Sequence, residues 1–371
     1  MGGGLALGMG SALAPGAALA SPAGSAATRP APARALRILI LGGTNLTGPH
    51  TVRYAVERGH RVSIFTRGRR EPGLFQEAFD HVEHLVGDRA GELDALRGKS
   101  WDVCIDASGS NVEWTRMSAE LLRDAVGTYV YISSTGVFYP YLTTEIPEDG
   151  PIQTTDPSGG SNGSARYGVM KALSEAEARK VFGERTLVVR PGYIVGPLDR
   201  THRGTYWPER LRRGGEVLAA GKPSDLVQQI DVRDLTEWMV HMMEGGVHGT
   251  FNATGPGYPL TMEEYLHGVR ATSSAEVTWT WVDDYAFLEE QRFTAAIPWI
   301  LPVGDHLGSQ RIDCSRARTA GLTYRPLAVT ALDTLAWYHS ADLTDEQRAA
   351  PPMALTPERE REILSAWRAR E

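Results

Sequence analysis

The chain has little of what marks a metal centre or a disulfide framework. Only two of its 371 residues are cysteines, Cys104 and Cys314, and its ten histidines are scattered without the spacing of metal ligands. We therefore expect neither a disulfide framework nor a metal site. Lysine is also scarce, and the net charge of −7 argues against nucleic acid as the main partner. A small molecule is the expected partner.

The first 35 residues have no acidic residue and no basic one before Arg29; they are mostly Gly, Ala, Ser and Pro. Leu5 to Ala20 resembles the apolar part of a secretory signal, and small residues at 18–23 suit cleavage, but the charged segment that normally precedes it is missing. The stretch is too short and too weakly apolar for stable membrane insertion. Two interpretations stay open: a signal for export to the periplasm or the exterior, or a disordered extension of a cytoplasmic protein.

From residue 36 onward, strand-like and helix-like patterns alternate. Helical patterns at 49–58 and 112–125 supply the crossovers that parallel strands need. We predict an α/β fold, a Rossmann-type doubly wound parallel sheet. The expected strands are an apolar run ending at Leu41, then 61–66, 82–86, 102–107, 128–133 and 186–190.

The predicted dinucleotide-binding domain spans 36–199, and 225–255 returns to it. Segments 200–224 and 256–340 are richer in Trp, Pro and turn residues and lack the alternation, so we predict a smaller C-terminal substrate lobe there. Residues 341–371 form the tail. Within it Thr356 to Arg370 reads as a charged amphipathic packing helix with a Thr-Pro-Glu start.

A Gly-rich turn follows the first strand. Gly42 and Gly48 take the outer positions of a GxxGxxG pattern, where the backbone can approach a pyrophosphate and the helix N-terminus stabilises its charge. Asn45 takes the middle glycine position. This departure weakens the match without breaking it, because Asn tolerates a left-handed backbone better than other non-Gly residues. The alternative is an ordinary strand-to-helix turn.

Tyr167 and Lys171 form a YxxxK pattern. Residues four apart fall on one helical face, so the phenol and the ammonium can act together in proton transfer. A neighbouring ammonium would lower the phenol pKa from its ordinary value near 10. The chain is therefore a candidate redox enzyme.

These features resemble the extended short-chain dehydrogenase/reductase superfamily, the NAD-dependent epimerase/dehydratase group, and within it the atypical, reductase-like members. The resemblance covers roughly residues 36–255. Besides the Gly-rich turn and YxxxK, its signatures are Gly59 to Val62, Gly87-Asp88, Tyr131 to Phe138, Arg190 to Pro197, and Ile230 to Asp234.

The resemblance implies a catalytic set. Tyr167 would be the general acid/base, Lys171 its activator and a ribose contact, and Ser134 the hydroxyl that polarises the substrate oxygen. Without Tyr167 and Lys171, Ser134 and its neighbour Ser133 would read as strand-end turn residues. The predicted cofactor contacts are Gly42, Thr44, Asn45, Leu46, Gly48, Arg67, Asp88, Ala107, Ser108, Tyr167, Lys171, Pro191, Tyr193 and Ile194.

The end of the second strand bears on the cofactor. An acidic residue there would bind the ribose 2′-hydroxyl of NAD, but Thr66 holds that position and Arg67, Arg69 and Arg70 follow. These arginines would favour a 2′-phosphate, so we predict NADP(H). NAD remains the alternative if Arg67 stacks on adenine and the other two are solvated.

The substrate is predicted only by class. In nucleotide-sugar members an Asn and an Arg hold the diphosphate, and the resemblance puts Tyr193 and Val227 at those positions. We therefore predict a substrate pocket lined by Ser134, Tyr193, Tyr206, Trp207 and Gln228 that suits a small carbonyl compound, lactone or unactivated sugar. For Tyr206 and Trp207 packing inside the lobe is the alternative.

Three functions remain, and the leading one is an NAD(P)-dependent reductase or dehydrogenase acting on a small carbonyl or hydroxyl compound by hydride transfer. The second is an epimerase or dehydratase of a sugar-like substrate that retains NAD, although Thr135-Gly136 offers no acidic residue for dehydration. The third is a non-catalytic dinucleotide-binding protein. The resemblance also implies a homodimer formed through the helix that carries Tyr167 and the helix before the fifth strand.

Overall fold

The structure is a computed structural model that describes residues 31–107, 111–156, 159–340, 343–344 and 355–370. Residues 33–371 form one compact unit, which contains all the helices and strands of the fold. No helix in these described ranges is both long enough and apolar enough to cross a membrane.

The centre of the unit is a seven-stranded sheet with the order β10-β6-β5-β4-β1-β2-β3. Every neighbouring pair in it is parallel. The order reverses beside β1, as in a doubly wound sheet, which confirms the predicted fold class. The strands are β1 (Arg37–Leu41), β2 (Arg61–Thr66), β3 (Glu83–Val86), β4 (Trp101–Asp106), β5 (Val126–Ile132), β6 (Thr186–Pro191) and β10 (Gly249–Ala253).

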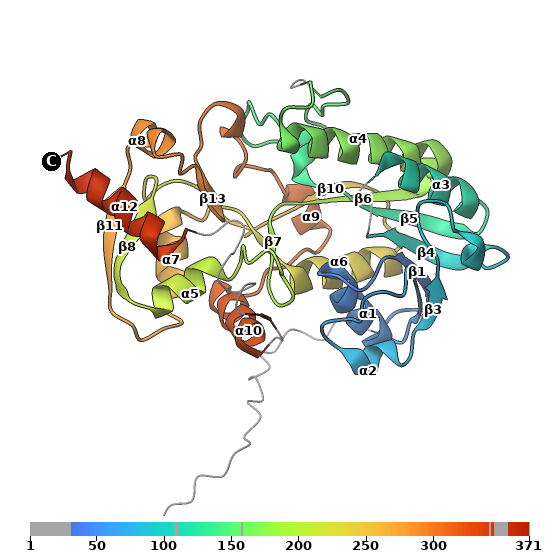
Figure 1. The fold of residues 1–371 in the computed structure, drawn as a ribbon. Helices are drawn as coiled ribbons and strands as arrows, with labels where there is room; N and C mark the ends of the chain where they lie inside the picture. The colour runs from blue at the N-terminus through green and yellow to red at the C-terminus, as the bar shows by residue number, and fades with distance from the viewer. Residues whose placement is uncertain (1–30, 108–110, 157–158, 341–342, 345–354, 371) are drawn as a thin grey trace, which may run out of the picture. The chain divides into compact units, whose positions relative to one another are not determined.

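Helices cover both faces of this sheet (Figure 1). Successive strand residues point to opposite faces. Ile38 and Ile40 of β1 therefore join the core under α1 (Thr47–Glu57) and α6 (Val232–Glu244). Leu39 and Leu41 join the core under α3 (Val112–Leu122) and α4 (Gly163–Phe182). Both faces are buried, which explains why the strand reads as a continuous apolar run.

The smaller lobe has a hydrophobic core of its own. There β8 (Gly215–Ala220) and β11 (Val277–Val282) form a parallel pair. The helices of the lobe are α5 (Tyr206–Arg212), α7 (Met262–Arg270), α8 (Tyr285–Glu290), α10 (Leu327–Ser340) and α12 (Pro357–Arg368). The remaining elements are α2 (Gln76–Phe79), α9 (Ser315–Thr319), β7 (Ile194–Val195), β9 (Ile230–Asp231), β12 (Ala295–Ala296) and β13 (Trp299–Ile300).

A buried ion pair and apolar contacts hold the C-terminal helix α12 on the lobe. Thr356 caps its start by accepting a hydrogen bond from the Arg359 N–H, which fits the predicted start signal. On the buried face the Glu360 carboxylate accepts from Arg210 Nε of α5 at 2.7 Å. Ile363 and Leu364 pack into the lobe core.

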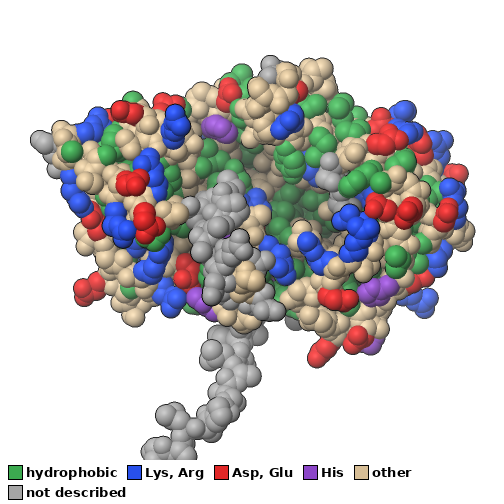
Figure 2. Space-filling view, viewed as in Figure 1, with side chains coloured by type: hydrophobic (Ala, Val, Ile, Leu, Met, Phe, Trp, Pro, Cys, Tyr) green, Lys and Arg blue, Asp and Glu red, His purple; other side chains and the backbone are tan. Residues whose placement is uncertain are grey.

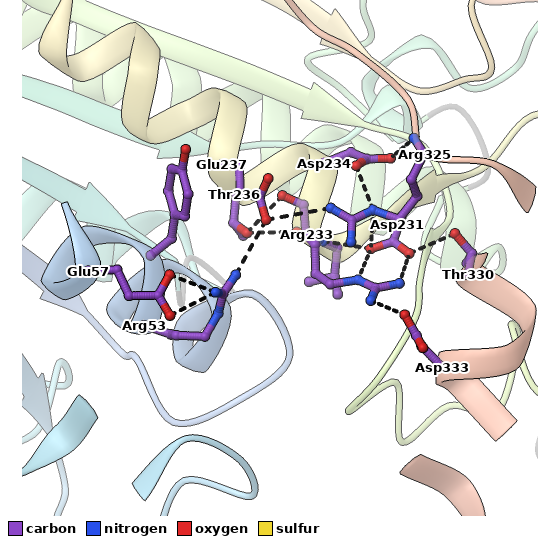
Figure 3. Close-up of polar contacts among 12 residues, drawn as sticks. Arg53, Glu57, Asp231, Arg233, Asp234, Thr236, Glu237, Arg325, Thr330 and Asp333 are labelled. Carbon is purple, nitrogen blue, oxygen red and sulfur yellow. Dashed lines mark hydrogen bonds and ion pairs between the residues drawn. The ribbon is translucent and has the colours of Figure 1, made fainter. Parts of the chain in front are cut away.

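Charged side chains connect α6 to the lobe (Figure 3). Asp231, which caps α6, accepts from Arg233 Nη2 at 2.7 Å and from Thr330 Oγ1 of α10 at 2.7 Å. Arg233 also pairs with Asp333 of α10. Arg325 Nε donates to Asp234 at 2.7 Å. The lobe is thereby anchored to a helix of the large sheet.

The structure departs from the sequence predictions in three places. The seventh strand, β10, was not predicted as a strand, although 225–255 was assigned to this domain. The lobe contains a parallel strand pair, although its segments lacked an evident alternation. Ala317 and Leu322 lie in the core of the large sheet, so the chain around α9 leaves the predicted lobe of 256–340 and returns to the dinucleotide-binding part.

Candidate active site

One cavity of about 990 Å³ lies where all seven parallel strands end. Residues at or just after the carboxyl ends of β1 to β6 and β10 line it, where α/β folds bind ligands. Figure 2 shows a hollow near the middle of one face, with many apolar side chains on its wall. The residues supplied by the strand ends are Gly42, Thr66, Gly87, Ala107, Ser133, Pro191 and Thr254.

The Gly-rich turn forms one end of the cavity. Gly42, Thr44, Asn45 and Leu46 line it. No side chain caps the start of α1, so backbone N–H groups at this helix end can donate hydrogen bonds to an anion.

Gly48 does not line the cavity. A Cβ at this position would stand 2.4 Å from the Gly43 carbonyl carbon, so its role is close packing of α1 against the turn. The left-handed backbone expected at Asn45 is wrong: positive φ occurs at Gly42, Gly43 and Leu46 instead.

Ser134, Tyr167 and Lys171 all line the same cavity, although 33 residues separate Ser134 from Tyr167. Ser134 caps the short helix η2 (Thr135–Phe138), its Oγ accepting from the Gly136 N–H at 3.0 Å. Tyr167 and Lys171 come from the first half of α4. Lys171 Nζ donates to the Ile132 carbonyl at 2.9 Å and lies 5.8 Å from the centroid of the Tyr167 ring.

Burial dominates the electrostatics of this pair. Tyr167 keeps 46% of its surface exposed, yet partial desolvation of the phenol raises its pKa, against the lowering effects of a hydrogen bond from Ser134 and of the Arg203 charge. The expected net lowering is therefore not found. Burial also lowers the pKa of Lys171 to about 8, opposed by the negative charges of Asp106 and Glu175. Lys171 is thus charged below about pH 8 and loses its charge above it.

Two buried ion pairs support the floor of the site. Asp106 at the end of β4 is held by Arg89, whose Nη1 is 2.7 Å from Oδ1. Glu175 of α4 accepts from Ser133 Oγ at 2.5 Å and from Arg190 Nη2 at 2.7 Å. These contacts connect β4, β5, β6 and α4, so they position the strand ends that carry the catalytic candidates.

The other end of the cavity suits the adenosine half of a dinucleotide. Arg67, Asp88 and Ala107, three of the predicted cofactor contacts, line it. Arg67, Arg69 and Arg70 are exposed, and none of them pairs with an acidic side chain within the described residues. Ser108 lies outside the described residues.

The substrate end combines predicted and unpredicted residues. Pro191, Tyr193, Ile194 and Gln228 line the cavity. Gln228 Nε2 donates to the Ile312 carbonyl at 3.0 Å and its Oε1 accepts from the Ile312 N–H at 3.0 Å, so it holds the wall in place.

Tyr206 and Trp207 do not line the cavity. They are buried in the lobe core with 7% and 1% of their surface exposed, so packing is their role and their prediction as substrate contacts is wrong. Val227 is buried as well and presents no anion anchor.

Sequence reasoning missed the wall that comes from the distant segment 300–312 and from the loop after β7. Segment 300–312 is far from the other site residues in the sequence and contains no recognisable motif, so no signal in the sequence indicates that it lines the cavity. Arg203 follows the Arg190 to Pro197 signature by six residues and could have been found by its charge. On this wall the missed lining residues are Arg203, Ile300, His306, Ser309, Gln310 and Ile312.

Comparisons with known proteins agree with this geometry. The model of the NAD dependent epimerase/dehydratase family matches residues 38–253. An Arabidopsis thaliana protein, the chloroplast stem-loop binding protein of 41 kDa b, is 28% identical over 60% of this chain. The matched region spans 59% of that relative's length. The human epimerase family protein SDR39U1 is 26% identical over 62% of this chain and 78% of its own.

Among solved structures, the Bordetella bronchiseptica enzyme WbmH in complex with NAD+ is similar with a TM-score of 0.61. The match covers 83% of this chain and 100% of WbmH, at 16% sequence identity. At that identity the likeness supports the fold.

Proposed function

This chain belongs to the NAD dependent epimerase/dehydratase family, and from that premise we propose that it is an NAD-retaining epimerase of a sugar-like substrate. One observation carries the proposal: a single cavity runs from the Gly-rich turn to Ser134, Tyr167 and Lys171. A dinucleotide and a substrate hydroxyl can therefore meet in one site.

The residues present fit a dinucleotide. The uncapped start of α1 and the close packing of Gly48 on Gly43 leave room for a pyrophosphate at the turn. Asp88 and Ala107, which line the cavity, would contact the adenosine half, and Lys171 would contact the nicotinamide ribose. When bound, the nicotinamide supplies a hydride acceptor that can also return the hydride.

The chain's own groups handle the proton. Tyr167 accepts the proton of a substrate hydroxyl as the carbon that bears it is oxidised. It returns this proton after the oxidised substrate has rotated to present its other face. Ser134 donates a hydrogen bond to the same substrate oxygen. Lys171 is charged below about pH 8, and a hydrogen bond to the Ile132 carbonyl holds its ammonium in place. Because burial raises the pKa of Tyr167, the charge that favours the phenolate would have to come from the positive nicotinamide ring, when bound.

The comparisons support an epimerase better than the reductase favoured by sequence reasoning. The matched family model and the human relative carry epimerase names. Dehydration is the weaker branch, because Thr135 and Gly136, next to Ser134, offer no acidic side chain.

Retained NAD is the cofactor that the likeness to WbmH supports, since that structure contains NAD+. NADP remains the second candidate because Arg67, Arg69 and Arg70 line the cavity beyond β2 and could bind a 2′-phosphate. Thr66 offers no carboxylate to repel it.

Mass spectrometry of the nucleotide released from freshly purified, denatured protein tests the proposal, with no nucleotide added during preparation. We expect stoichiometric NAD. An empty protein that binds NADPH more tightly than NADH would contradict the epimerase and favour the reductase. A protein that binds neither would exclude both enzymes.

Tyr167→Phe tests the acid/base role. Removing a positioned proton-transfer group should lower turnover about 100- to 10,000-fold, measured as transient reduction of the bound nucleotide by a sugar. Nucleotide content should stay unchanged. Tyr258→Phe is the matched control, because Tyr258 is 61% exposed and outside the cavity. Equal turnover in both variants would contradict the acid/base role of Tyr167, and no turnover in the parent protein would favour a non-catalytic binding protein.

A further inference from the structure

Arg203 brings a positive charge to the substrate end of the cavity. It lies in the loop between β7 and α5 and lines the cavity together with Tyr167 and Tyr193. Its Nε donates to Thr201 Oγ1 at 2.7 Å, and its guanidinium lies 5.7 Å from the centroid of the Tyr193 ring. These two contacts hold the guanidinium in a defined place.

Arg203 forms an ion pair with the buried Asp199 carboxylate but makes no hydrogen bond to it. Asp199 is buried and already accepts hydrogen bonds from the Thr201 N–H at 3.1 Å, from the Thr201 hydroxyl and from the Gly204 N–H at 3.2 Å. The closest Arg203 nitrogen is 3.9 Å away, beyond hydrogen-bonding distance. The outer edge of the guanidinium is thus available for a ligand.

The other cations of the cavity have different places. Arg89 pairs with Asp106, and Lys171 donates to the Ile132 carbonyl. Arg67, Arg69 and Arg70 follow β2 at the end assigned to adenosine. Among the described Lys and Arg side chains that line the cavity, Arg203 is therefore the one placed for a substrate group.

A single guanidinium matches a single carboxylate. Planar Arg forks bind carboxylates through two parallel hydrogen bonds. A diphosphate carries more charge than one arginine balances, and Val227, where a second anchor would stand, is buried and apolar.

Hydroxyl groups suit the remaining wall. His306, Ser309 and Gln310 bring polar side chains to it. Imidazole, hydroxyl and amide groups on a cavity wall can exchange hydrogen bonds with the hydroxyls of a polyhydroxylated ligand.

We propose that the substrate is a monocarboxylic sugar acid or related polyhydroxy acid, whose carboxylate binds Arg203 while one of its hydroxyls faces Tyr167. This inference rests on the proposed function, because it names the substrate class of that site. It assigns to Arg203 the selection of an acid over a nucleotide sugar.

Calorimetric titration of the purified protein tests it with three acids, D-glucuronate, D-galacturonate and D-gluconate. D-Glucose, D-galactose, D-glucose 6-phosphate and UDP-glucose are the comparison ligands. We expect at least one acid to bind about tenfold or more tightly than its neutral counterpart, as befits hydrogen bonds to a charged group. Arg203→Gln should abolish that preference, and Arg203→Lys should keep part of it.

Arg200→Gln is the matched control, because Arg200 is an exposed arginine of the same loop that does not line the cavity. It should leave the preference intact. Unchanged thermal unfolding of Arg203→Gln would show that the variant is folded.

Tighter binding of D-glucose 6-phosphate or UDP-glucose, equal binding of acids and neutral sugars, no binding of any acid, or a preference that survives Arg203→Gln would each overturn the proposal. Nucleotide content of the same samples separates the two hypotheses. NAD-containing protein without acid preference contradicts only the role of Arg203, whereas protein without nucleotide contradicts the proposed function.

Discussion

His50 lies in α1 just behind the Gly-rich turn, and its side chain is fully buried. Its Nε2 lies 3.0 Å from the Pro197 carbonyl, and its Nδ1 has no hydrogen-bond partner among the described residues. Burial lowers the pKa of His50 to about 4, because a charged imidazole there would be poorly solvated. The native protein therefore keeps His50 neutral, and it connects the turn to the loop after β7.

This burial predicts acid sensitivity. The unfolded chain takes up the proton near pH 6.5 and the folded chain only near pH 4, so the contribution of neutral His50 is complete above about 6.5 and is lost as the pH falls to 4. The loss should be about 3 kcal/mol in the free energy of unfolding, measured by urea titration across that range.

His50→Gln should show a shallower pH dependence than the parent protein, whatever its stability at neutral pH. His81→Gln is the control, since His81 is exposed. Parallel pH curves for His50→Gln and the parent would show that His50 is not buried neutral.

At the scale of elements, the contact between α4 and η2 sets the catalytic geometry. Gly168 follows Tyr167 directly, and a Cβ there would stand 2.2 Å from the Gly136 carbonyl oxygen. Gly136 in turn belongs to the turn that Ser134 caps. The absence of a side chain at Gly168 thus lets the helix bring Tyr167 up to Ser134.

Gly168→Ala should separate the two elements. We expect a loss of about 1 to 3 kcal/mol in stability from overpacking, and a fall in turnover because the phenol moves away from the substrate oxygen. Chemical denaturation and nucleotide-reduction kinetics would measure both. Gly163→Ala in the same helix is the control, because a Cβ there has open space, and it should not lower the stability. Full stability and activity in Gly168→Ala would contradict this account.

At the scale of the whole molecule, α4 presents an apolar stripe that its own chain leaves partly uncovered. Val169, Met170 and Leu173 are each half-buried, and none of them joins a core cluster among the described residues. Burying such a stripe against the same helix of a second copy would remove apolar surface from water.

We therefore predict a homodimer formed through α3 and α4. Light scattering after size exclusion should give twice the mass of one chain, and Leu173→Glu should shift it to the monomer by placing charge in the interface. Leu332→Glu is the control, because Leu332 is 50% exposed on α10, away from that stripe. A monomeric parent protein would reject the prediction.

Local features of the sequence were enough for six of the seven strands of the sheet, all but β10. The continuous apolar run at 36–41 reflects burial on both faces, and periodicity alone located the strands up to β6 within about two residues of their observed bounds. Short motifs singled out the Gly-rich turn and the pair Tyr167 and Lys171, and the family resemblance singled out Ser134. The structure brings them to one cavity, and their catalytic roles stay predictions.

Only the tertiary structure decided how the cavity is closed and what it can bind. Tyr206 and Trp207 looked like substrate contacts, but the lobe packs them inward. The segment 300–312 lines the same cavity as Tyr167 because the chain returns to the large sheet after building the lobe, and Arg203 reaches that cavity from the loop after β7. Local patterns record which face of an element is buried. Contacts between segments a hundred residues apart depend on how whole elements pack, and no short pattern carries that information.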